Sequence, residues 1–193
     1  IVVFTSDHGY HMGEHGHWQK QTLFDNATKV PLIINVPGKY YTSKISSSPV
    51  ELIDIFPTLM DLTNITTPAH VVGQSLKPII ENKSLDVRKN ALTRWRNGYS
   101  IMTERYRLTK WDINGDFQYE LYDHKFDEEE LNNLALDSNY NLIRDSLIQT
   151  INHRIFQADM KPEGIGRQIE NVKPIPRITN VTYGDIHNEN GNR

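Results

Sequence analysis

The chain opens with Ile1-Val2-Val3-Phe4-Thr5-Ser6-Asp7-His8-Gly9, where a run of apolar residues is followed at once by polar and ionisable ones. A continuous β-branched and aromatic run of this kind predicts a strand that is buried on both faces of a sheet. In open α/β sheets, ligands bind at the carboxyl ends of the strands. The stretch therefore predicts an α/β fold with a ligand site at Asp7 and His8.

A dense group of histidines follows this strand. His8, His11, His15 and His17 are four of the eight histidines in the chain and lie within ten residues of one another, beside Asp7. Adjacent Asp7 and His8 offer one oxygen and one nitrogen ligand, which suits a divalent metal whose remaining ligands come from elsewhere. The alternative is a loop rich in glycine and histidine that only satisfies its own backbone.

The segment His11-Met12-Gly13-Glu14-His15 also matches the His-x-x-Glu-His pattern of inverted zincins. That pattern holds zinc only on a helix, because residues four apart then share one face. Gly9, Gly13 and Gly16 each oppose a helix by about 1 kcal/mol relative to alanine. We therefore expect a shaped loop over residues 9–20 rather than a zinc-binding helix.

Periodicity predicts the remaining elements. Residues 30–36 predict a second buried strand, residues 50–62 a helix kinked at Pro57, and residues 75–80 a short helix. Residues 99–108 and 117–122 alternate around Asn114-Gly115, which predicts an antiparallel meander, and residues 131–156 predict a long helix. We expect residues 1–90 to be part of an α/β domain, residues 91–160 to form a smaller α+β subdomain with an antiparallel sheet, and residues 161–193 to be an extended tail or arm.

The segment Asp112-Ile113-Asn114-Gly115-Asp116 begins like a calcium-binding loop. Such a loop requires glycine and glutamate at the positions held here by Phe117 and Asp123. A hairpin turn therefore explains the segment better.

Composition excludes several classes of protein. The 193 residues carry 21 Lys+Arg against 24 Asp+Glu, a formal charge of −3, so nucleic-acid binding through bulk charge is not expected. With no cysteine there is no disulfide, thiolate zinc site or cysteine nucleophile. The apolar runs are too short for a membrane span, and no signal peptide is visible. Because the chain begins within a predicted strand and without methionine, we expect a piece of a longer protein.

Several blocks of the sequence resemble the C-terminal portion of type I sulfatases, the formylglycine-dependent enzymes of the alkaline-phosphatase-like superfamily. The blocks are Val3-Phe4-Thr5-Ser6-Asp7-His8-Gly9, Gly13-Glu14-His15-Gly16, Lys20, Phe24-Asp25, Val30-Pro31-Leu32-Ile33 and Glu120-Leu121-Tyr122-Asp123. Gly16-His17-Trp18-Gln19-Lys20 most resembles the iduronate-2-sulfatase branch. The resemblance implies the C-terminal part of the α/β sulfatase fold, and a periplasmic, extracellular or lysosomal location.

The resemblance also implies roles for particular side chains. Asp7 and His8 correspond to the second pair of ligands to the active-site Ca²⁺, for which Mg²⁺ is a possible substitute. His8 also lies near the sulfate, and Lys20 holds a sulfate oxygen and the bridging ester oxygen, so His8 and Lys20 are the expected catalytic residues. A cation and an ammonium group would offset the charge that develops on the leaving oxygen. We expect Trp18 to contact the substrate.

Other parts of the family's site have no counterpart in this chain. The nucleophile, a formylglycine made within a Cys/Ser-x-Pro-x-Arg motif, is absent, since Ser47-Ser48-Pro49-Val50-Glu51 has glutamate in place of arginine. The first pair of acidic metal ligands is also absent. We therefore expect half of a site, completed by the N-terminal portion of the same enzyme, and no activity from this segment alone.

Trp95, flanked by Arg94 and Arg96, is the candidate contact for an acidic glycan. A guanidinium group would bind a uronic-acid carboxylate in a bidentate manner while Trp95 stacks on the sugar, although solvated arginines at a strand end are the alternative. The expected function is hydrolysis of sulfate esters in a sulfated sugar or polysaccharide. The alternatives are a phosphodiesterase or phosphonate hydrolase of the same superfamily, and a non-catalytic relic domain.

Overall fold

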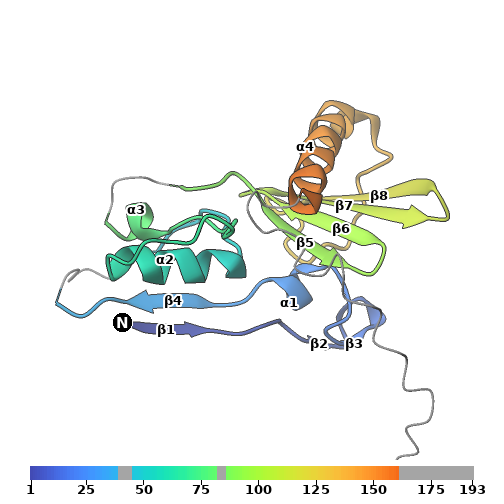
Figure 1. Cartoon of the computed structure of the whole chain (residues 1–193). Helices are drawn as coiled ribbons and strands as arrows, with labels where there is room; N and C mark the ends of the chain where they lie inside the picture. The colour runs from blue at the N-terminus through green and yellow to red at the C-terminus, as the bar shows by residue number, and fades with distance from the viewer. Residues whose placement is uncertain (39–44, 82–85, 161–193) are drawn as a thin grey trace, which may run out of the picture.

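The computed structural model describes residues 1–38, 45–81 and 86–160, so the predicted tail at 161–193 lies outside the described residues. Its strands and helices fall into two groups, with β1, β4, α2 and α3 at one end of the molecule and a four-stranded sheet with α4 at the other (Figure 1). The bounds are β1 Val2–Thr5, β2 His11–Met12, β3 Trp18–Gln19, α1 Asp25–Thr28, β4 Leu32–Asn35, α2 Ile55–Leu62, α3 Lys77–Ile80, β5 Ala91–Trp95, β6 Gly98–Met102, β7 Tyr106–Ile113, β8 Asp116–Asp123 and α4 Asn141–Asp159. Short 3₁₀ turns lie at Glu14–Gly16, Leu52–Asp54 and Ser138–Tyr140.

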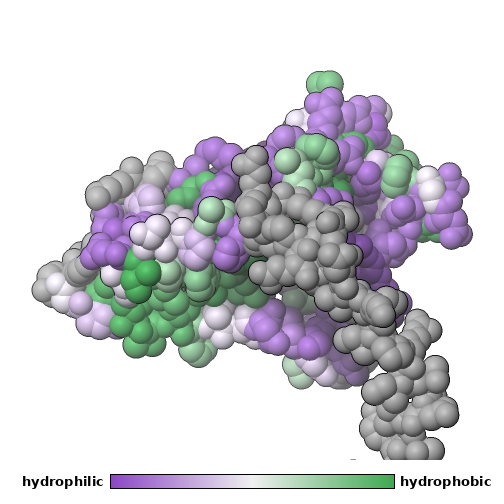
Figure 2. Space-filling model, viewed as in Figure 1, coloured by the Kyte–Doolittle hydropathy of each residue, from purple (hydrophilic) through white to green (hydrophobic). Residues whose placement is uncertain are grey.

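The first predicted strand is confirmed, but it is not buried on both faces. β1 pairs antiparallel with β4, placing Phe4 opposite Ile33, and Val2, Phe4 and Ile33 expose 60%, 60% and 59% of their surface. Among the described residues β1 and β4 pair only with each other, and the exposure of Val2, Phe4 and Ile33 shows that the face they share is uncovered. Figure 2 shows apolar side chains gathered at this end of the molecule.

The predicted helix over residues 50–62 is present but begins later, as a 3₁₀ turn that leads into α2. Asp54, fully buried, accepts hydrogen bonds from the N–H groups of Glu51 at 2.9 Å and Gln74 at 2.8 Å and pairs with Arg88. These contacts hold the start of the helix. Pro57 lies in the first turn of α2, where no backbone N–H is needed, so the predicted kink is wrong.

The C-terminal sheet confirms the predicted meander. Its order is β5-β6-β7-β8, all antiparallel, and Asn114 and Gly115 both have positive φ (58° and 93°) in the turn between β7 and β8. The Asp112 carboxylate accepts a hydrogen bond from the Gly115 N–H at 2.8 Å, so the side chain serves the turn. The hairpin interpretation of this segment is therefore confirmed.

One face of the sheet carries the core. Ile101, Leu108 and Leu121 are opposite one another on β6, β7 and β8, are fully buried, and pack with Leu147 and Ile151 of α4. α4 begins ten residues later than the predicted helix over 131–156. The Asn133 side chain accepts hydrogen bonds from the N–H groups of Leu121 and Ala135, and this competition keeps the preceding segment out of a helix.

Candidate functional site

The segment after β1 folds back on itself, which places Lys20 beside His8. β2 and β3 pair as a short hairpin, and Lys20 follows β3 directly. Gly9 makes this path possible, because it lies so close to α1 that a Cβ atom would be 1.9 Å from the carbonyl oxygen of Asn26. As a result the Lys20 Nζ atom lies 2.6 Å from His8 Nε2.

The hydrogen bonds of His8 determine which ring nitrogen is available. His8 Nδ1 is 2.7 Å from the carbonyl oxygen of Gly9, so Nδ1 carries the proton and donates it. Nε2 then presents a lone pair, which faces Lys20 and lies 3.5 Å from Asp7 Oδ1. The three predicted residues Asp7, His8 and Lys20 therefore converge on one region at the carboxyl end of β1.

This arrangement suits part of a cation site. An exposed carboxylate and an imidazole nitrogen, 3.5 Å apart, can both reach one cation when the Lys20 ammonium turns from that nitrogen toward an anion. Calcium takes six to eight oxygen ligands, so these two residues supply a minority of its ligands. Lys20, which is exposed, can reach an anion held beside the cation.

The other histidines of the cluster pack within the loop. His11 is fully buried, with Nε2 2.6 Å from Thr22 Oγ1, and His15 stacks on Phe24 with ring centroids 3.8 Å apart. Burial lowers the pKa of His11, which keeps it neutral. His11 lies in a strand and Glu14 and His15 in a 3₁₀ turn, so the zincin pattern is not on a helix, as expected.

The predicted substrate contacts separate into different places. Trp18 is exposed on β3. Arg94 lies over the Tyr99 ring at 5.1 Å, whereas Arg96, at positive φ in the turn after β5, lies 5.5 Å from the Trp95 ring. Arg96 and Trp95 line a pocket of about 340 Å³, and Arg94 does not line it.

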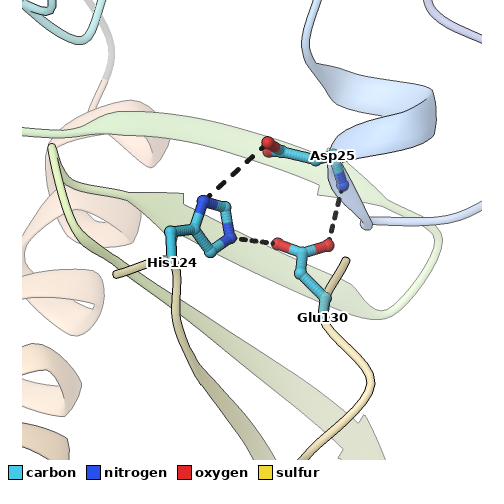
Figure 3. A group of neighbouring side chains, drawn as sticks. All are labelled: Asp25, His124 and Glu130. Atoms are coloured by element: carbon cyan, nitrogen blue, oxygen red, sulfur yellow. Dashed lines mark hydrogen bonds and ion pairs between the residues drawn. The ribbon is translucent and has the colours of Figure 1, made fainter. Parts of the chain in front are cut away.

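A largely buried ionic cluster that the sequence did not predict joins α1 to the segment after β8 (Figure 3). Asp25 of α1, His124 and Glu130 present ligand atoms within 4.8 Å of one another, an arrangement that could hold a metal. His124 Nε2 is 2.8 Å from Glu130 Oε1, and Glu130 also accepts a hydrogen bond from the Asp25 N–H at 2.8 Å. Arg107 of β7 is 2% exposed and donates to both carboxylates.

Arg107 already supplies the positive charge that this cluster needs. Burial raises the pKa of Asp25, but the charges of Arg107, Lys29 and His124 outweigh it, and the net pKa is lowered. Arg107 also donates to Ser100 Oγ on the neighbouring strand β6 at 3.1 Å, which fixes the position of its guanidinium group. The geometry favours an ion network that joins α1 to the sheet. No signal in the sequence marked Glu130, because the network exists only when distant segments meet.

Comparison with known proteins identifies the family of this chain. Residues 13–157 match the C-terminal region of N-sulphoglucosamine sulphohydrolase. The chain belongs to this sulfatase C-terminal family. An N-acetylglucosamine-6-O-sulfatase from Bacteroides thetaiotaomicron is 31% identical over 163 residues, which are 78% of this chain and 29% of that protein. Arylsulfatase K from Gallus gallus is 28% identical over 70% of this chain and 28% of its own length.

Solved structures share the fold of this chain. A protein solved with its substrate, D-glucosamine-2-N,6-O-disulfate, matches with a TM-score of 0.74 and 29% identity over 85% of this chain and 36% of its own. A phosphonate monoester hydrolase from Silicibacter pomeroyi matches with a TM-score of 0.71 and 26% identity over 82% and 35%. The predicted fold class, an α/β part of an alkaline-phosphatase-like sulfatase followed by an antiparallel sheet, is confirmed.

The sulfatase chain spans less than a third of the length of these curated relatives. Among its described residues, no helix combines the length and the apolar character needed to cross a membrane.

The ionic cluster of this sulfatase chain should stabilise the folded protein. Arg107→Met removes the guanidinium that contacts both half-buried Asp25 and buried Glu130, which should lower the free energy of unfolding of the full-length protein by about 3–5 kcal/mol. Lys89→Met, at an exposed lysine that pairs with Asp86, should leave it nearly unchanged. Urea unfolding measures both, and equal effects would contradict the assigned role of Arg107.

The same cluster predicts a dependence on acid. The pKa of folded Asp25 lies below its ordinary value of 3.8, so its stabilisation is complete above that pH and is lost as the pH falls through the folded value. The free energy of unfolding of Asp25→Asn should therefore come closer to that of the wild type as the pH falls below about 4. A difference that stays constant over this range would contradict the shift.

Proposed function

We propose that this chain is the C-terminal part of a sulfatase that hydrolyses sulfate esters of a sulfated sugar, and that Asp7, His8 and Lys20 form its share of the active site. The observation that carries the proposal is the convergence of Lys20 Nζ on His8 Nε2 at 2.6 Å, beside Asp7. The relatives that act on sulfated glucosamine support a sugar substrate.

The chemistry follows from the three side chains. Asp7 and His8 Nε2 would hold a divalent cation, Ca²⁺ or Mg²⁺, which neutralises charge on the bound sulfate. The Lys20 ammonium would hold a sulfate oxygen and the bridging ester oxygen, stabilising the charge that develops on the leaving oxygen. The formylglycine nucleophile would come from the rest of the protein, so this segment alone would be inactive.

The exposed side chains near the site would contact the sugar. Trp18 lies two residues before Lys20, and the Arg96 guanidinium would bind an acidic group of the glycan. Arg94, held over Tyr99, would contact a more distant part of the glycan. The segment Gly16-His17-Trp18-Gln19-Lys20 supports a place in the iduronate-2-sulfatase branch, and the sulfatase resemblance supports a periplasmic, extracellular or lysosomal location.

A second candidate function is phosphonate ester hydrolysis. The similarity to a phosphonate monoester hydrolase favours it, because a site that holds a tetrahedral anion can accept either ester. Rates of sulfate and phosphonate release by the full-length enzyme separate the two activities. Release of neither would favour a non-catalytic relic.

Lys20 provides the sharpest test of the sulfatase proposal. Lys20→Met should lower kcat/KM of the full-length enzyme for a sulfated monosaccharide by about 10²–10³-fold, because the leaving oxygen loses its positively charged partner. Lys125→Met, which changes an exposed lysine two residues after the end of β8, is the control. Activity of Lys20→Met close to that of the control would refute the role.

Asp7 should be needed for cation binding. Asp7→Asn should weaken Ca²⁺ binding to the full-length protein by at least about tenfold, as measured by calorimetry, because a carboxylate ligand becomes neutral. The control Asp116→Asn, in the hairpin turn that resembles a calcium loop, should bind as wild type does. Tight Ca²⁺ binding to the isolated segment would contradict the shared site.

The remaining part of the enzyme is the proposed partner of the apolar ribbon. Val2, Phe4 and Ile33 expose a continuous apolar face on β1 and β4, and the relatives contain more than twice as much chain as this segment. Burying that face against the N-terminal portion would stabilise both parts by removing apolar surface from water.

Lysine substitution on the ribbon tests this packing. Phe4→Lys should lower the free energy of unfolding of the full-length protein by several kcal/mol, about 2–5, because a charge would be buried without a partner. Phe126→Lys, at a phenylalanine that is 74% exposed, should cost about 0.5 kcal/mol or less. Equal costs would show that Phe4 is not covered.

A further inference from the structure

The sheet carries a pocket on the face opposite α4. Side chains alternate between the two faces of a strand, and Ile101, Leu108 and Leu121 face α4. Trp95, Gly98 and Trp111 are opposite one another three residues along the strands from that row, an odd number, and therefore share the other face. The pocket, of about 340 Å³, is lined there by both tryptophans, and Gln21 and Thr22 contribute from the segment that follows Lys20.

Trp111 is held firmly at this pocket. A Cβ atom on Gly98 would lie 2.4 Å from the Trp111 ring and 2.9 Å from Leu23, so the ring rests directly on the glycine backbone. An aromatic ring fixed in this way offers a flat apolar surface at little cost in conformational entropy. Such a surface suits the apolar face of a sugar ring.

Two ionisable groups of opposite charge line the same pocket. Arg96 is exposed, Glu120 is half-buried and accepts a hydrogen bond from the Trp111 side chain, and among the described residues no ion pair joins Arg96 to Glu120. Burial raises the pKa of Glu120, and the negative charge of Glu130 adds to this effect while Trp111 partly opposes it. An arginine and a carboxyl group that face one pocket without pairing leave room for a ligand between them.

We infer that this pocket is a subsite for an anionic sugar residue adjacent to the one that carries the scissile sulfate. Trp111 stacks on the ring, Arg96 binds its carboxylate or sulfate group, and Glu120 accepts hydrogen bonds from its hydroxyl groups. The volume lies at the lower end of the range for small-molecule sites and suits about one sugar ring. The inference rests on the proposed function, because Gln21 follows Lys20 directly and links the pocket to the sulfate site.

Substrates of different length test the subsite in the full-length enzyme. Arg96→Gln and Glu120→Gln should each raise KM for a sulfated disaccharide containing a uronic acid by about tenfold, because each loses a charge-assisted hydrogen bond. KM for the corresponding sulfated monosaccharide should stay within about twofold of wild type, since that substrate does not reach the pocket. Arg144→Gln and Glu129→Gln, both outside the pocket, are the matched controls.

A carboxyl-reduced disaccharide identifies the group that Arg96 binds. If the anion is the carboxylate, Arg96→Gln should no longer raise KM when the disaccharide is carboxyl-reduced. It should keep its effect if the anion is a second sulfate. Either result supports an anionic sugar in the pocket, whereas equal losses on the monosaccharide and disaccharide, or no loss on either, would overturn the subsite.

Binding of a desulfated disaccharide separates this inference from the proposed function. Calorimetry on the wild type and on Glu120→Gln measures pocket occupancy without catalysis. If the wild type cleaves no sulfate ester but binds the disaccharide about tenfold more tightly than Glu120→Gln does, the subsite stands and the sulfatase proposal falls. If the wild type cleaves sulfate esters and both proteins bind the disaccharide equally, the subsite falls.

Discussion

Arg107 is the side chain on which the arrangement of this molecule depends. It lies on β7 and donates to Asp25, at the start of α1, and to Glu130, in the loop after β8. Two buried carboxylates this close repel each other, and the guanidinium turns that repulsion into attraction. Because α1 follows the segment that carries Lys20, the same ion network sets the position of that segment against the sheet.

The reactive end of β1 depends on contacts that are local in sequence. Gly9 allows the backbone to approach α1, and the β2–β3 hairpin returns the chain so that Lys20 meets His8. The histidines that face inward serve this loop, since His11 contacts Thr22 and His15 stacks on Phe24. The dense group of histidines thus combines His8, which faces Lys20 and Asp7, with others that hold its loop.

The two faces of the antiparallel sheet carry different kinds of side chain. The face toward α4 carries Ile101, Leu108 and Leu121, whose burial stabilises the subdomain. The opposite face carries the arginine of the ion network in one row and the tryptophans of the pocket in another. Side-chain alternation with a period of two makes this division possible, because neighbouring residues in one strand serve different purposes.

The sequence by itself determined the features that depend on near neighbours. The strand at β1, the Asn114-Gly115 hairpin, the meander and the grouping of Asp7, His8 and Lys20 could all be predicted, because periodicity, turn chemistry and recognisable motifs are local signals. Element ends were predicted less well, because they depend on bonds to distant segments: Asp54 fixes the start of α2 through Gln74, and Asn133 keeps its segment out of α4 through Leu121. Only the tertiary structure decided that Glu130 meets Asp25 across 105 residues, and that Trp111 and Glu120 share a pocket with Arg96. Charge pairing and pocket formation join residues far apart in the chain, and no local pattern records which of them will meet.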